Sequence, residues 1–253
     1  MKLSLKNPTI RYDDTGFVVW EGTSQIDGKT PIAIIATMRT ENGKTGKMIQ
    51  TWIVRRYGDP VKNVRMGWDY AICGRCPYRA GNGCYVNVGQ APLAVWTKYR
   101  AGGYRRVAPE ALPLIGKGKL VRMGSYGDPT AAPLAVWESL VSQSRGRTGY
   151  THQWKWLRSA KPFRRFIMAS TDSPRERAEA NRRRWRSFRV KSKGDPRERG
   201  EMNCPASVEM GKRVQCSSCL ACNGTDSTRT LDVVIDVHGA KSKRVELYQL
   251  GLK

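Results

Sequence analysis

Seven cysteines constrain this chain more than any other feature, because they all fall into two tight groups. The groups are Cys73, Cys76 and Cys84 in CGRCPYRAGNGC, and Cys204, Cys216, Cys219 and Cys222 in CPASVEMGKRVQCSSCLAC. Thiolates two residues apart can turn toward one centre, and without a secretion signal this spacing favours a soft metal over disulfides. We therefore expect metal-bound cysteine loops in a reducing compartment.

The second group favours an iron–sulfur cluster. Its Cys-x2-Cys-x2-Cys run, with the remote Cys204 followed by Pro205, is similar to the bacterial ferredoxin run. A zinc ribbon would instead pair two separate Cys-x2-Cys knuckles, and zinc is the alternative. The expected cofactor is a 4Fe-4S cluster.

The first group supplies only three thiolates, so a second cluster there would need another ligand or would keep one iron open. Water, Asp128, His152 or His238 could close the site, which could also be a three-cysteine zinc site. We expect two sites, one for each cysteine group.

The charge balance predicts a polyanionic partner. The formal net charge is +24 at pH 7 over 253 residues, and self-repulsion of this size destabilises a compact state unless an anion relieves it. Nucleic acid is the expected partner. No stretch approaches the roughly 18 apolar residues of a membrane span, and the first residues lack the apolar core of a signal peptide, so no membrane partner is expected.

The order of patterns predicts an α/β fold. Short β-rich runs at 17–20, 32–38 and 48–55 predict a β-meander in an N-terminal β-rich layer over residues 1–60. Over residues 61–253, strand and helix patterns alternate, which predicts a parallel β/α core shaped as a partial barrel. Strands are expected at 84–88, 120–125, 149–154, 165–170 and 230–237.

Two signals predict helices. The hexapeptide APLAVW occurs at 91–96 and again at 132–137, and each copy places proline in the first turn of an expected helix. Ser173 and Glu176 form a capping box for a helix that continues to about residue 186.

Ligands of such a core gather where strands end and helices begin. The side chains expected at these junctions, as candidates for one pocket, are Cys84, Asn87, Gln90, Tyr126, Asp128, His152 and Ser170. As a residue that enters a helix, Asp128 fits a cap better than a catalyst.

Residues 161–199 hold the densest basic stretch, and aromatic rings are interspersed in it. Basic side chains neutralise phosphates and aromatic rings stack on exposed bases, although such rings can equally belong to the core. Trp154 and Trp156 alternate with His152 in THQWKW, which would place all three on one face of a strand. The predicted contacts with nucleic acid are Arg164, Arg165, Arg175, Arg182, Arg183, Arg184, Arg186, Arg189, Lys191, Lys193, Trp154, Trp156 and Trp185.

Several motifs, in this order along the chain, can be compared with those of a known family. They are NGKTG, CGRCPYRAGNGCYVNVGQAPLAVW, GSYGDP, RTGYTHQW, MASTDSP and the second cysteine block through VHGAKSKR. Together, over about residues 40–244, they resemble a family of cysteine-rich, iron–sulfur-type proteins of tailed phages and plasmids. The resemblance implies a mobile-element origin, a location in the cytoplasm of a bacterial host, and iron–sulfur ligation by the matching cysteines.

Two looser similarities concern the possible activity. The order of strands and cysteines is similar to the partial barrel of radical S-adenosylmethionine enzymes, but those enzymes use Cys-x3-Cys-x2-Cys where this chain has Cys-x2-Cys-x7-Cys. The second similarity is to phage iron–sulfur proteins that bind single-stranded DNA.

These observations predict a phage iron–sulfur protein that binds nucleic acid, single-stranded DNA in replication or recombination. Two alternatives stay open: an iron–sulfur enzyme that modifies nucleic acid, and a zinc-stabilised adaptor protein. The sequence has no P-loop and no Ser-His-Asp pattern, so it identifies no catalytic residue. It does not determine the oligomeric state.

Overall fold

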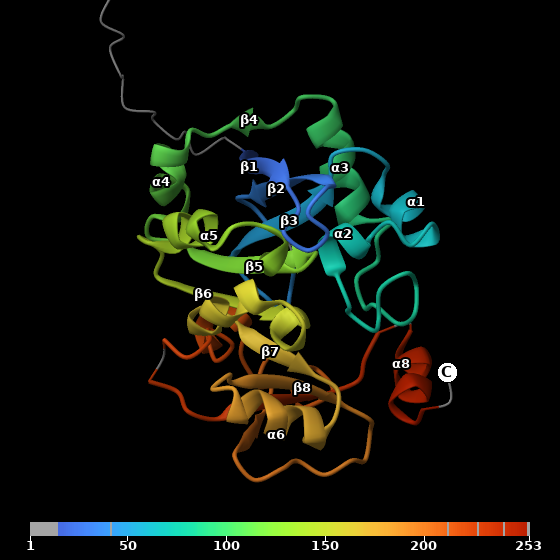
Figure 1. Cartoon of the computed structure of the whole chain (residues 1–253). Coiled ribbons are helices and arrows are strands. Elements are labelled where there is room, and N and C mark those ends of the chain that lie inside the picture. Colours follow the sequence, from blue (N-terminus) through green and yellow to red (C-terminus); the bar gives the residue numbers. More distant parts are fainter. Residues whose placement is uncertain (1–14, 41, 212, 227, 240, 252–253) are drawn as a thin grey trace, which may run out of the picture.

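A computed structural model describes residues 15–40, 42–211, 213–226, 228–239 and 241–251 (Figure 1). The fold is mixed α/β, built on one ten-stranded sheet with the order β4-β1-β2-β3-β5-β6-β7-β8-β10-β9. The strands are β1 Gly16–Thr23, β2 Pro31–Thr37, β3 Ile49–Arg55, β4 Arg105–Arg106, β5 Leu120–Tyr126, β6 Gly146–Thr151, β7 Met168–Thr171, β8 Ser187–Lys191, β9 Glu201–Asn203 and β10 Asp232–Asp236.

The predicted meander is confirmed for β1, β2 and β3, which pair antiparallel in sequence order. Residues 1–14 of the predicted N-terminal layer lie outside the described residues. The meander joins the larger sheet directly, because β3 pairs parallel with β5. From β3 to β9 every neighbouring pair is parallel, as the alternating pattern predicts.

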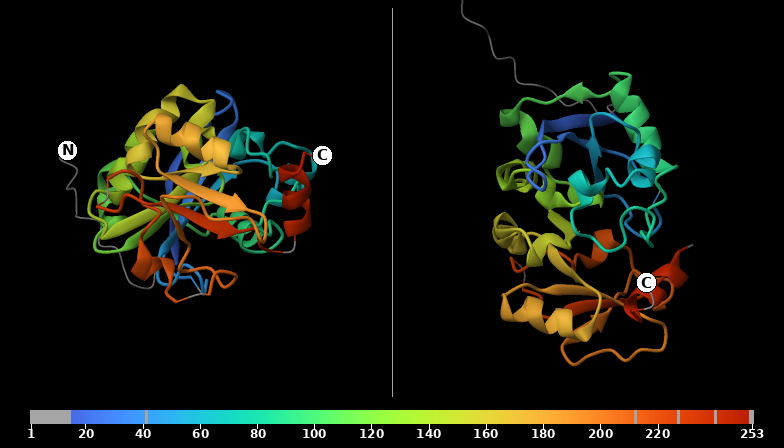
Figure 2. Two further views of the ribbon diagram at one scale, coloured as in Figure 1. Left: turned by 90° about the horizontal axis from the view of Figure 1, so that it is seen from below. Right: turned by 45° about the vertical axis from the view of Figure 1, so that its right-hand side comes forward.

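Short helices connect and cover the strands (Figure 2). The α-helices are α1 Pro60–Arg65, α2 Tyr70–Cys73, α3 Ala91–Arg100, α4 Leu112–Gly116, α5 Leu134–Val141, α6 Pro174–Arg182, α7 Cys216–Cys219 and α8 Ser242–Gln249. The 3-10 helices are η1 Pro109–Ala111, η2 Pro129–Ala131, η3 Gln153–Lys155 and η4 Arg158–Arg165.

The two APLAVW copies open the helices α3 and α5, as predicted. Pro92 lies in the first turn of α3, but Pro133 is the residue before α5, so the helix of the second copy starts two residues later in the repeat. In both helices the proline nitrogen needs no hydrogen-bond partner, because the first N–H groups of a helix have none within it.

The strand predicted at 84–88 is wrong. The chain there turns instead: the Cys84 backbone N–H donates to Tyr78 O at 2.9 Å, and Gly81 and Gly83 have positive φ. Such backbone angles suit glycine and interrupt a ladder. The segment after α2 is therefore a loop, and it lies beside α8, where the Arg244 side chain donates to Gly81 O at 2.7 Å (Figure 1).

The strand predicted at 149–154 ends early, at Thr151. The chain then turns through η3, so His152, Trp154 and Trp156 do not share one face of a strand. Trp154 is buried and its indole N–H donates to Ser170 O at 2.8 Å, whereas Trp156 is exposed. The helix predicted to reach residue 186 ends at Arg182, because Arg184 takes a left-handed conformation with φ 62°.

Candidate nucleic-acid interface and cysteine sites

The carboxyl ends of β5, β6 and β7 lie at one edge of the parallel sheet and place Asp128, His152 and Asp172 there. Asp128 is buried at the start of η2 and accepts hydrogen bonds from the Thr130 N–H and hydroxyl, the Thr151 hydroxyl and the His152 N–H. Burial raises the pKa of Asp128, and the bonds from Thr130 oppose that rise. Asp128 thus serves as a helix cap that ties β5 to β6.

His152 lies beside the Asp172 carboxylate and near the Cys76 thiol. Its Nε2 is 3.5 Å from Asp172 Oδ2, and the Tyr78 hydroxyl donates to Asp172 Oδ1 at 2.6 Å. Burial lowers the pKa of His152, but the neighbouring Cys76 and Asp172 outweigh burial and leave that pKa well above its ordinary value. The ring also meets Tyr78 edge-on, with centroids 5.8 Å apart.

The first cysteine group lies at the same edge. Burial raises the pKa of the Cys73 thiol, and the charges of Cys76, Asp69 and Cys84 raise it further, so these groups are close enough to interact. Burial also raises the pKa of Cys84 to about 11. Tyr126, at the end of β5, interacts with Cys73 and Cys84 as well. Of the predicted pocket residues, Cys84, Tyr126, Asp128 and His152 therefore belong to one neighbourhood.

Asn87 and Gln90 are placed differently. Both are exposed, Asn87 in the loop before α3 and Gln90 at its start. The Asn87 side chain accepts from the Gly89 N–H at 3.2 Å, which closes a local turn. The Ser170 carbonyl accepts from the Trp154 indole, so this part of β7 anchors a core side chain.

The second cysteine group gathers in a separate core cluster. Cys204, Cys216 and Cys222 are buried together and Cys219 packs against them. α7 begins at Cys216, whose N–H donates to Lys44 O at 2.9 Å, and this bond ties the group to the turn before β3. Burial raises the pKa of Cys222 to about 12 despite a hydrogen bond with Tyr150.

All seven cysteines are free thiols. In the part of the chain that the structure describes, no three His, Cys, Asp or Glu side chains adopt the arrangement of a metal-binding group. The donor chemistry of the second group nonetheless suits a soft metal, because Cys204 and the segment 216–222 bring four thiols to one apolar cluster. Burial raises the pKa of the Cys204, Cys216 and Cys222 thiols, so ligation of a metal by them would release protons.

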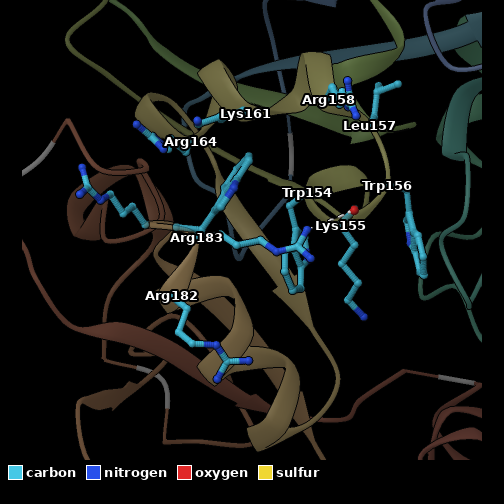
Figure 3. Close-up of a pocket in the computed structure, with 11 residues that line it drawn as sticks. Trp154, Lys155, Trp156, Leu157, Arg158, Lys161, Arg164, Arg182 and Arg183 are labelled. Atoms are coloured by element: carbon cyan, nitrogen blue, oxygen red, sulfur yellow. Dashed lines mark hydrogen bonds between the residues drawn. The ribbon is translucent and has the colours of Figure 1, made fainter.

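A basic hollow with a volume of about 610 Å³ opens beside η3 and the end of α6 (Figure 3). It is lined by Trp154, Lys155, Trp156, Leu157, Arg158, Lys161, Arg164, Arg182, Arg183, Arg184 and Trp185. We call this set the basic hollow. It combines cationic side chains with indole rings, so it offers both phosphate contacts and stacking surfaces.

Two of the cations that line the basic hollow form ion pairs with neighbouring glutamates. Lys155 forms an ion pair with Glu176, and Arg183 forms one with Glu179. The Arg183 guanidinium also lies 5.6 Å from the centre of the Trp154 ring. The side chains of Trp154 and Trp185 are buried beneath the surface of the hollow. The Trp156 side chain is 55% exposed, so its ring is the one that a ligand can reach.

Three predicted contacts with nucleic acid need correction. Arg186, Arg189 and Lys191 lie inside the fold, because β8, which contains Arg189 and Lys191 and directly follows Arg186, is internal to the sheet. Arg189 is only 2% exposed and makes paired 2.7 Å hydrogen bonds with Glu201. Lys191 is paired with Asp236 at 2.5 Å, and Arg186 donates to the carbonyls of Gly224 and Leu231. These side chains stabilise the fold and do not face a partner.

The other predicted contacts divide between the hollow and its surroundings. Arg164, Arg182, Arg183, Arg184 and the three tryptophans line the hollow. Arg165 is paired with Asp226 at 3.3 Å, while Arg175 and Lys193 are exposed outside the hollow. The sequence interpretation missed Lys155, Leu157, Arg158 and Lys161, although the basic character of WKWLRSAK is a visible signal.

Comparison of the chain with protein-family models, with curated proteins and with solved structures finds no match. Among the described residues, no helix has both the length and the apolar character needed to cross a bilayer.

Proposed function

We propose that this chain binds single-stranded nucleic acid, DNA in the first instance, through the basic hollow, as an iron–sulfur protein of a mobile element that acts in the cytoplasm of its bacterial host. The observation that carries the proposal is the meeting of cations and indole rings from two separate segments, 154–164 and 182–185, in one open hollow. Such a combination suits a strand whose bases are unpaired, because every base has a face that can stack.

Charge supports the same function. Arg158, Lys161, Arg182 and Arg184 line the hollow, and no ion pair involves them among the described residues. They remain available for phosphates, and the net charge of +24 supplies a long-range attraction for a polyanion.

The cysteine groups would hold the iron. Cys204, Cys216, Cys219 and Cys222 would ligate a 4Fe-4S cluster, and Cys73, Cys76 and Cys84 a second one, forming the metal-bound loops that the sequence predicts. A cluster would cross-link the second group's segments and could transfer single electrons. Zinc is the alternative occupant, and metal and sulfide counts per chain on anaerobically purified protein distinguish the two.

Binding is tested on the anaerobic holoprotein by fluorescence anisotropy with labelled strands of about 16 nucleotides, the upper range for compact single-strand sites. Each lost phosphate contact should lower the slope of log K against log salt by about 0.7 for a single strand. Arg182→Ala/Arg184→Ala should therefore reduce the slope by about 1.4.

The matched control is Lys117→Ala/Arg145→Ala. These two exposed cations precede β5 and β6, at the opposite edge of the sheet from His152. This variant removes the same charge and should keep the slope close to that of the parent protein. Equal slopes for both double variants would refute the hollow as the binding site, and absence of binding at low salt would refute the function.

A further inference from the structure

Trp156 belongs to two features at once. It lines the basic hollow, and its exposed ring carries the Arg75 guanidinium 4.9 Å from the ring centre. Arg75 lies between Cys73 and Cys76, in the loop that carries the first cysteine group. In Figure 3 the Trp156 ring stands apart from Trp154, at one side of the hollow. The ring thus forms a boundary between the hollow and the cysteine loop.

A second contact fixes this neighbourhood. The Gln153 side chain donates to Cys73 O at 2.9 Å and accepts from the Arg75 N–H at 3.2 Å. Gly74 leaves room for it: a Cβ at that position would lie 2.3 Å from Gln153 Oε1. The Gln153 side-chain amide therefore links the backbone of residues 73–75 to η3, the helix that precedes Trp156 at the hollow.

Further links reach the same loop. The Asp128 N–H donates to Ile72 O at 2.6 Å, and the Asp128 carboxylate accepts from the His152 N–H. His152 in turn interacts with Cys76. The residues from 152 to 156 therefore contact the cysteine loop at one end and form a wall of the hollow at the other.

We infer that the strand bound in the basic hollow continues across Trp156 onto the loop that carries the three cysteines. A strand that leaves the hollow stacks one base on Trp156 in the place of Arg75, and the next nucleotide lies against the loop from Arg75 to Tyr85. The displaced Arg75 is then free to contact a phosphate. This inference rests on the proposed function and extends its binding surface to the loop that carries Cys73, Cys76 and Cys84.

Three properties of the surface support a nucleic acid there. Arg75 is exposed beside an exposed indole, an arrangement that a base can enter by stacking. Arg79, within the loop and paired with Asp69, lies 5.2 Å from the centre of the exposed Tyr70 ring. Tyr85 is 58% exposed and offers a further ring within the loop.

The test is photo-cross-linking of the anaerobic holoprotein to single strands that carry one 5-iodouracil at successive positions, with DNA and RNA versions of each strand. Cross-linked peptides are mapped by mass spectrometry. We expect adducts at Trp156 and within residues 75–85 when the iodinated base lies near one end of the bound segment.

Two other outcomes are distinct. Cross-links confined to residues 158–185, with normal binding, would overturn this inference and leave the proposed function intact. Absence of binding by any strand would overturn the proposed function itself. The DNA and RNA arms show which strand reaches the loop.

A variant pair provides an independent measurement. Trp156→Ala should weaken strand binding roughly tenfold and abolish adducts within 75–85, since stacking on an aromatic ring contributes strongly to single-strand affinity. Trp68→Ala is the matched control, because Trp68 is also exposed and also lies against an arginine, Arg55 at 5.2 Å, but is not part of the hollow. Equal affinities and adduct maps for both variants would overturn the inference.

Discussion

Arg184 occupies a position where a glycine is expected. α6 ends in a Schellman motif, in which the Trp185 N–H donates to Ala180 O and the Arg184 N–H to Asn181 O, both at 2.9 Å. The residue after the cap then adopts a left-handed conformation, and Arg184 does so with φ 62°. Glycine is usual there because it has no Cβ to clash. Under the proposed function, the arginine is kept at this strained position because its side chain lines the basic hollow and contacts the strand.

Replacing Arg184 by glycine should separate stability from binding. The left-handed conformation costs a residue with a Cβ about 1–2 kcal/mol, and glycine adds about 0.5–1 kcal/mol of unfolded-state entropy. The balance predicts that Arg184→Gly raises the free energy of unfolding by about 0.5–1 kcal/mol. The same variant should bind single strands more weakly and lower the salt slope by about 0.7.

Urea denaturation followed by tryptophan fluorescence measures the first effect, and anisotropy titration measures the second. Arg184→Ala is the control, because it removes the same side chain and keeps the Cβ. It should lose as much affinity as Arg184→Gly without gaining stability. If Arg184→Gly is no more stable than Arg184→Ala, or if both bind as tightly as the parent protein, the reasoning is refuted.

Three further predictions concern the interior. Asp128→Ala should lower the free energy of unfolding, measured by urea denaturation, by about 3 kcal/mol, because buried donors from Thr130 and Thr151 lose their acceptor. Asp128→Asn should lower the free energy of unfolding by less, because its side-chain oxygen can still accept. Arg189→Ala should cost about 3–5 kcal/mol, because it removes the paired hydrogen bonds of the buried Glu201 and leaves only the more distant Arg177, at 3.5 Å, beside it. Burial raises the pKa of Glu201, but the hydrogen bonds from Arg189 and the Glu198 N–H, together with the charges of Arg189 and Arg177, outweigh burial and lower that pKa. The contribution of the Arg189–Glu201 pair is therefore present above the ordinary pKa of a glutamate and should disappear as the pH falls through the lowered pKa. A pH series of unfolding curves in which Arg189→Ala loses as much stability with acid as the parent protein would contradict this. Cys216→Ser should lower the iron content of anaerobically purified protein by about four atoms per chain and weaken absorbance near about 400 nm, and an unchanged iron count would exclude Cys216 as a ligand.

The periodic parts of the fold were predictable. β1, β2 and β3 are apolar runs bounded by polar turns, and such local patterns are sufficient to place strands. The start of α6 is equally local, because the Ser173 hydroxyl accepts from the Glu176 N–H within a few residues. In contrast, 84–88 has strand-like residues but is a loop, since the glycine turns before it and the contact with α8 outweigh propensity.

The candidate site was predictable only in part. The spacing of the cysteines predicted two groups, and each group's members lie near one another. The basic stretch was visible in the sequence as charge, but the sequence did not show which of its arginines are exposed and which are buried. Arg182 and Arg184 line the hollow, whereas Arg189, a few residues later, is buried. Arg75, Gln153 and Asp172 gave no signal of their own, because each acquires its role from partners distant in the sequence.

The amino-acid sequence by itself determined the α/β class, the cationic character and the grouping of the thiols, since these depend on composition and on contacts between residues close along the chain. Only the tertiary structure decided which arginines remain at the surface and that the loop of Cys73 to Cys84 lies against the wall of the hollow. The reason is that sheet order fixes both: it makes β8 an internal strand, and it brings the ends of β5, β6 and β7 to one edge, where segments far apart in the chain become neighbours.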